Sequence, residues 1–137
     1  MNAAEVEHVY GEGKLVAIIV PHEYNPPTTD FVTTNDRNLQ VGFIKYPAGG
    51  TIQPHVHLPL ERHLVGTGEV LIVRSGKMEV SLFDDSRRLV RQRTLSAGDI
   101  LVLVSGGHGF RMSEDTVLVE VKQGPYTGLA EKERFEP

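Results

Sequence analysis

Two histidines, His55 and His57, stand one residue apart in the segment 49–57. In an extended strand successive side chains alternate between the two faces, so histidines at positions i and i+2 lie on the same face. Two neighbouring imidazoles are suitable ligands for a divalent first-row metal. We therefore expect His55 and His57 to begin a metal site.

His108 is a third candidate ligand. It follows an apolar segment and the pair Gly106-Gly107, and glycine lets a backbone turn sharply and approach a neighbour closely. We expect residues 105–107 to form a tight loop that leads into His108, just past the end of a strand. The chain has no cysteine, which excludes disulfides, thiolate zinc sites and cysteine nucleophiles. Any metal must be held by imidazole and carboxylate groups.

The carboxylate ligand has two candidates, Glu61 and Glu69. Glu69 opens a clear strand, in which Leu71 and Val73 would share its inward face. A returning strand that starts at Glu61 would run through residues 62–67 and end in glycine and threonine, which are poor strand residues here. We favour Glu69, and Glu61 stays open as the alternative.

Short apolar or alternating segments, separated by glycine, proline, asparagine and aspartate, must position these groups. Such segments are typical of β-strands. The expected strands cover residues 15–20, 39–46, 51–57, 69–74, 78–83, 89–95, 100–104, 110–113 and 116–122. No useful helical period occurs, and the spacing of the turns is typical of an all-β sandwich or barrel. Residues 1–14 are expected to form an arm and a turn, the turn at Gly11-Glu12-Gly13, residues 58–68 a loop at the rim of a pocket, and residues 123–137 a polar tail.

The chain of 137 residues is the size of one domain, and its 39% hydrophobic and 23% charged residues are ordinary for a globular protein. The net charge of −4 argues against a nucleic-acid partner. Residues 1–7 form no secretory signal, and no apolar run is long enough to span a membrane. We expect a cytoplasmic protein with no membrane partner.

Consecutive apolar positions favour a homodimer. Residues 15–20, 70–73, 100–104 and 117–119 are apolar on both faces of their expected strands. Antiparallel sheets usually leave one face polar, and no helix is expected that would cover the second face. A second subunit is the expected cover.

The two groups of motif residues resemble the two motifs of the cupin superfamily, over about residues 39–122. The first motif in its common spacing is matched by five residues: Gly49, His55, His57, Glu61 and Gly68. The second resembles the stretch from Gly98-Asp99 to His108. It departs from the family in having Val104 where a proline is usual, one residue fewer before His108, and Met112 in place of a common asparagine.

The chain is still more similar to the WbuC-like cupins found among bacterial surface-polysaccharide genes. They combine a longer spacing from the histidine pair to the glutamate with a tail like residues 120–126, followed by Glu131-Lys132 and Phe135. This resemblance supports Glu69. It implies a single domain, 1–137, folded as a double-stranded β-helix or jelly-roll barrel, with a metal held by His55, His57, Glu69 and His108. It does not define an activity.

Three histidines and one carboxylate leave coordination positions open for water or substrate, and suit Zn, Fe, Ni, Cu or Mn. The function expected from this resemblance is a metal-binding cupin that binds or acts on a small carbohydrate or similar oxygenated ligand, by isomerase, epimerase or lyase chemistry. An iron-dependent dioxygenase and a non-catalytic sugar- or metal-binding module in polysaccharide metabolism stay open as alternatives. Whether the protein is an enzyme is left open.

Four further side chains have open roles. His63 shares strand parity with His57 and is either a general base in the pocket or part of its rim. Arg62 and Arg74 are suited to an anionic substrate, although alternation places Arg74 on the face opposite Glu69. Glu120 lies in an apolar strand, and a buried acid needs a partner, either an arginine or a neighbour of Lys122.

Overall fold

The computed structural model describes residues 5–137, apart from the side chains of two residues in the C-terminal helical turn. The all-β prediction is confirmed, because the regular structure of the described chain consists of strands, apart from one short helical turn. Every strand pair in it is antiparallel. The helical structure found there is one short turn, η1 (Gly128–Glu131). The chain divides into two compact units, one of residues up to Asn25 with Thr67–Pro137, and one of Pro26–Gly66.

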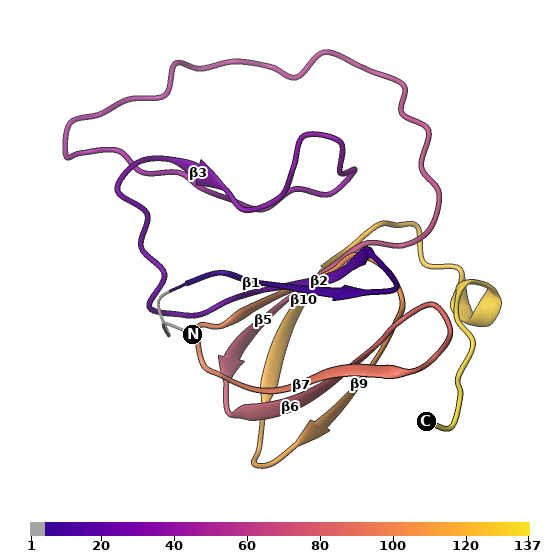
Figure 1. Ribbon diagram of the computed structural model, residues 1–137. Helices are drawn as coiled ribbons and strands as arrows, with labels where there is room; N and C mark the ends of the chain where they lie inside the picture. Colours follow the sequence, from indigo (N-terminus) through magenta and orange to yellow (C-terminus); the bar gives the residue numbers. More distant parts are fainter. Residues whose placement is uncertain (1–4) are drawn as a thin grey trace. The chain divides into compact units, whose positions relative to one another are not determined.

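The first unit contains two sheets (Figure 1). The larger has the strand order β1-β2-β8-β5-β10, with bounds Glu7–Gly11, Lys14–Val20, Ile100–Leu103, Glu69–Ser75 and Val117–Lys122. The smaller has the order β7-β6-β9, with bounds Leu89–Ser96, Lys77–Phe83 and Gly107–Met112. These bounds confirm six expected strands within two residues at each end, and they extend the expected strand 110–113 back to Gly107.

The core of this unit lies between its two sheets. Strand β6 alternates as its sequence predicts, with Met78, Val80 and Leu82 fully buried. They belong to one cluster with residues of the larger sheet, including Leu71 and Val73 of β5. Burying a side chain of this size contributes about 1.5–3 kcal/mol, so this cluster is the main source of stability and fixes how β5 faces β6.

Burial within the single chain removes part of the reason for expecting a second subunit. All five residues Val16–Val20 of β2 are at most 6% exposed, and Leu101–Leu103 of β8 are at most 5% exposed. The apolar residues of β10 differ, since Val117, Val119 and Val121 remain 53%, 38% and 49% exposed. Among the four apolar segments, the one in β10 is thus left with exposed side chains that a second subunit could bury, and a homodimer stays a prediction.

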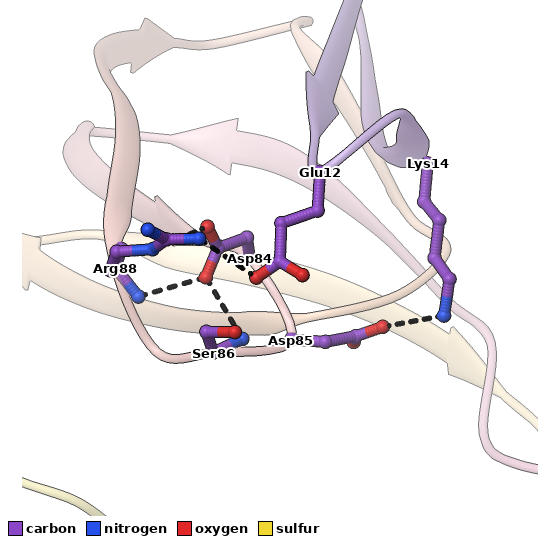
Figure 2. A network of polar contacts seen from close by, with 6 residues as sticks. All are labelled: Glu12, Lys14, Asp84, Asp85, Ser86 and Arg88. Carbon is purple, nitrogen blue, oxygen red and sulfur yellow. Dashed lines mark hydrogen bonds and ion pairs between the residues drawn. The ribbon is translucent and has the colours of Figure 1, made fainter.

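A network of polar contacts ties the β1–β2 turn to the β6–β7 turn (Figure 2). Asp84 is 4% exposed and accepts hydrogen bonds from backbone N–H groups of its own turn, including that of Arg88 at 2.9 Å. The Arg88 guanidinium then reaches Glu12 at 3.3 Å. A second ion pair joins Lys14 to Asp85 at 2.8 Å. The backbone N–H groups at Asp84 and the charge of Arg88 hold the pKa of Asp84 below its ordinary value.

The turn expected within residues 1–14 is found at Glu12 and Gly13, but the expected arm is wrong at residues 7–11, which form a strand. Residues 1–4 lie outside the described chain. Residues 7–11 form β1, which pairs with β2. Val9 is fully buried, and the Glu7 carboxylate accepts two hydrogen bonds from Arg93, of 3.0 and 2.8 Å. With one inward apolar side chain, β1 is too short for its pattern to show in the sequence.

The second unit, Pro26–Gly66, contains little regular structure. Its strands are two residues each, β3 (Asp30–Phe31) and β4 (Gly42–Phe43), paired with one another. The expected strand 39–46 is thus reduced to β4, and 51–57 has no regular structure. An isolated extended segment is not stable in water without a hydrogen-bonded neighbour. In this unit, segment 51–57 pairs with no strand among its described residues.

Candidate functional site

The two histidines of the first motif lie in the second unit. Their ring centroids are 5.2 Å apart and both side chains are exposed. The Nδ1 atom of His55 lies 2.8 Å from the carbonyl oxygen of Gln53. A carbonyl oxygen only accepts hydrogen bonds, so this contact favours the neutral tautomer with its proton on Nδ1. That tautomer suits a metal ligand through Nε2.

Glu69 lies in the first unit, as the first residue of β5. The expectation that it shares an inward face with Leu71 and Val73 is consistent with the structure, since both are buried in the core. Its cross-strand partners are Leu103 on β8 and Lys122 on β10, and residues opposite one another in an antiparallel pair share a face. Glu69 thus begins the inward-facing row of β5, and the two residues that follow it in that row, Leu71 and Val73, are apolar.

Glu120 on β10 forms a side-chain hydrogen bond with Glu69. Burial, together with the hydrogen bond and negative charge of Glu120, raises the pKa of Glu69 to about 7, against a smaller opposing effect of Lys122 and Lys132. Two interacting carboxyl groups lose their protons in two coupled steps. Near neutral pH Glu69 is therefore partly protonated, whereas an isolated glutamate would be ionised.

The expectation that Glu120 is buried is wrong, because its side chain is exposed. Of the two expected kinds of partner, an arginine or a neighbour of Lys122, the structure has the second: Glu69, the cross-strand partner of Lys122. As a residue of an edge strand, Glu120 reaches solvent even though Leu118, two residues earlier on the same face, packs against the core. The pattern of apolar residues does not reveal which strand is at an edge.

His108 lies in the first unit, within β9 and opposite Leu82 of β6. Because Leu82 is fully buried, His108 is on the inner face of the smaller sheet. The tight loop expected before His108 is found at Ser105 and Gly106, where Gly106 has a φ of 71°, but the strand begins at Gly107 rather than at Phe110 and so includes His108. The surrounding protein lowers the pKa of His108 by desolvation, opposed by the charge of Glu120.

Glu69, Glu120 and His108 therefore gather at one end of the core of the first unit, from both of its sheets. His55, His57, Glu61, Arg62 and His63 belong to the second unit, where all five are exposed. The strand parity expected for His63 does not arise, because its segment is irregular. Across residues 5–137 no three His, Asp or Glu side chains are close enough together to hold a metal.

Asp99 of the second motif is held in place by a contact with His22 that the sequence did not reveal. The backbone N–H of His22 donates to Asp99 Oδ1 at 2.7 Å, and the His22 ring Nδ1 lies 3.0 Å from the same oxygen. Asp99 is 8% exposed and also accepts the backbone N–H of Ser96 at 2.8 Å. The residue pair Gly98-Asp99 thus anchors the β7–β8 turn to the end of β2. The signal in the sequence for this turn was Gly98, which has a φ of 90° in the structure.

No family model matches the chain, and no curated protein or solved structure is significantly similar to it. The resemblance to cupins rests on the motif residues alone. Within the described part of the chain, no helix is long and apolar enough to cross a membrane.

Proposed function

We propose that the chain is a cupin-type metal-binding protein whose ligands are His55, His57, Glu69 and His108. The observation that carries this proposal is the gathering of Glu69 and His108 at one end of the core, on facing sheets of the first unit. Both residues interact with Glu120. The ligand of such a site is a small carbohydrate or a similar oxygenated molecule.

The proposal requires residues 39–46 and 51–57 to complete a jelly-roll barrel. Strands β9 and β10 are consecutive in the chain, and each is an edge strand in the described part of its sheet. Edge strands offer unpaired backbone groups to a further strand. Addition of 51–57 to β9 would bring the histidine pair next to His108, and addition of 39–46 to β10 would cover Val119 and Val121.

The available donors fit a divalent first-row metal. His55 offers Nε2, because its Nδ1 proton is engaged by Gln53. His108 favours its neutral form, since desolvation lowers its pKa. Glu69 must release its proton to become a ligand, and the charge of Lys122, opposite it on β10, favours the ionised form. A bound metal would act as a Lewis acid on a carbonyl or hydroxyl oxygen of the ligand.

Substitution of the two candidate carboxylates tests the proposal. Glu69→Gln is expected to weaken metal binding by about tenfold or more, because it replaces an anionic ligand by a neutral amide. Glu61→Gln is the matched control and should leave the affinity unchanged. Isothermal titration with Zn²⁺ and with Ni²⁺ measures both. Equal affinity in the native protein and in Glu69→Gln would refute the assignment, and a loss confined to Glu61→Gln would transfer it to Glu61.

A further inference from the structure

The C-terminal tail, residues 123–137, is fixed at its beginning beside Glu69. The Gln123 side-chain oxygen accepts a hydrogen bond from the backbone N–H of Gly68. The backbone N–H of Gln123 donates in turn to the Gly68 carbonyl at 3.4 Å. Gly68 directly precedes Glu69, so the tail leaves β10 next to this carboxyl group.

The far end of the tail is fixed beside His108. The Phe135 ring makes an edge-to-face contact with Phe83, with centroids 5.1 Å apart. Its ring atoms lie 3.0 Å from the position that a Cβ of Gly107 would occupy, so the absence of a side chain there makes room for Phe135. The Arg87 guanidinium lies 5.1 Å from the Phe135 ring centroid and pairs with Glu133. The tail thus runs from the neighbour of Glu69 to the neighbour of His108.

Two lysines of this region face the same group of side chains. Lys122 is half-buried, is the cross-strand partner of Glu69, and holds its Nζ 5.3 Å from the Tyr126 ring centroid. Lys132 precedes the Phe135 anchor by three residues, and its charge acts on both Glu69 and His108. The two lysines come from different segments, and the charges of both act on Glu69, although Lys132 itself is exposed.

We propose that Lys122 and Lys132 bind an anionic group, carboxylate or phosphate, of the ligand that the site receives. This inference rests on the proposed metal-binding function. The two lysines offset the two carboxylates Glu69 and Glu120, so a divalent metal leaves the site with excess positive charge. A neutral sugar would not balance that charge, whereas a sugar acid or sugar phosphate would. Ammonium groups form charge-assisted hydrogen bonds with both kinds of anion.

The test uses the full chain loaded with Co²⁺, whose visible absorption changes when an anion binds at or near the metal. Inorganic phosphate and acetate are titrated separately, so that the two titrations distinguish the two anion classes. Lys122→Ala and Lys132→Ala are each expected to weaken the Kd of the preferred anion by roughly three- to tenfold, the range for a partly exposed charge pair. The anion titrations are made at saturating Co²⁺, so that a change in Co²⁺ affinity in these variants does not affect the measured anion Kd. Lys77→Ala removes an exposed lysine at the start of β6 and should leave the anion Kd unchanged.

Phe135→Ala adds a second test, because it releases the anchor of Lys132 without removing a charge. It is expected to weaken anion binding as Lys132→Ala does. The inference is overturned if the native Co²⁺ protein binds neither anion, or if both lysine variants bind them as tightly as the native protein does. In both of these outcomes metal binding stands. Absence of Co²⁺ binding by the native protein would instead refute the proposed function, and this inference with it.

Discussion

At the scale of single residues, Glu69 and Glu120 set the charge of the proposed site. Burial and the hydrogen bond with Glu120 raise the pKa of Glu69 from 4.5 to about 7. The folded chain therefore holds this proton more tightly than the unfolded chain does. In the metal-free protein, the contribution of Glu69 to stability is present below pH 4.5 and is lost as the pH rises through about 7.

Metal binding should have the opposite pH dependence, because a ligating carboxylate must lose its proton. Below pH 7 the apparent affinity is expected to fall by up to about tenfold per pH unit, and above pH 8 Glu69 should add no further dependence. His108 has a lowered pKa and adds no dependence above pH 7. Calorimetric titrations with Zn²⁺ at several pH values measure this.

Glu120→Gln provides the control for the pH profile. It removes the negative charge that raises the pKa of Glu69, so the fall in affinity should move to lower pH. The same pH profile in Glu120→Gln as in the native protein would contradict the coupling of the two carboxyl groups.

At the scale of elements, the strands that the sequence predicted well are those with a complete pattern of their own. Strand β6 alternates along its whole length, and β5 and β8 are short runs of branched apolar residues bounded by turns. Strand β1 was missed because it is only five residues long. Its strand structure depends on pairing with β2 and on the burial of Val9, and neither is visible in so short a segment. The strand that contains His108 was expected to start at Phe110 but starts at Gly107, since only the first of the two glycines makes the turn.

The core between the two sheets predicts a clear difference between two leucines of neighbouring strands. Leu82 of β6 is fully buried, whereas Leu89 of β7 is 53% exposed. Leu82→Ala is expected to lower the free energy of unfolding by about 2–5 kcal/mol, through lost burial and the cavity left behind. Leu89→Ala should stay within about 0.5 kcal/mol of the native value. Urea denaturation followed by circular dichroism measures both, and equal losses would contradict the arrangement of β6 and β7.

At the scale of the whole molecule, the sequence predicted the inward face of Glu69 but not how distant segments pair. Glu69 lies on the inner face of the first unit with Leu71 and Val73, as the strand pattern indicated. The segment 51–57 is irregular, because strand pairing depends on a neighbour distant in sequence. Local patterns predict that such a segment is extended, but they do not supply its partner.

Hydrogen exchange tests whether this segment joins β9. In the metal-loaded protein, the backbone amides of residues 51–57 are expected to exchange slowly, because strand pairing protects them. Residues 58–66 are the control and should exchange fast, since that stretch is irregular and mostly exposed. Peptide mass spectrometry after deuterium labelling resolves the two segments. Equally fast exchange in both would contradict closure of the barrel.

The most direct test of the central claim is the metal content of the native chain and of the double variant His55→Ala with His57→Ala, both purified without chelator. Inductively coupled plasma mass spectrometry should find close to one divalent first-row metal per native chain and almost none in the double variant. Circular dichroism should show both to be folded, because the two side chains are exposed and outside the core. Full metal content in the folded double variant would contradict the account.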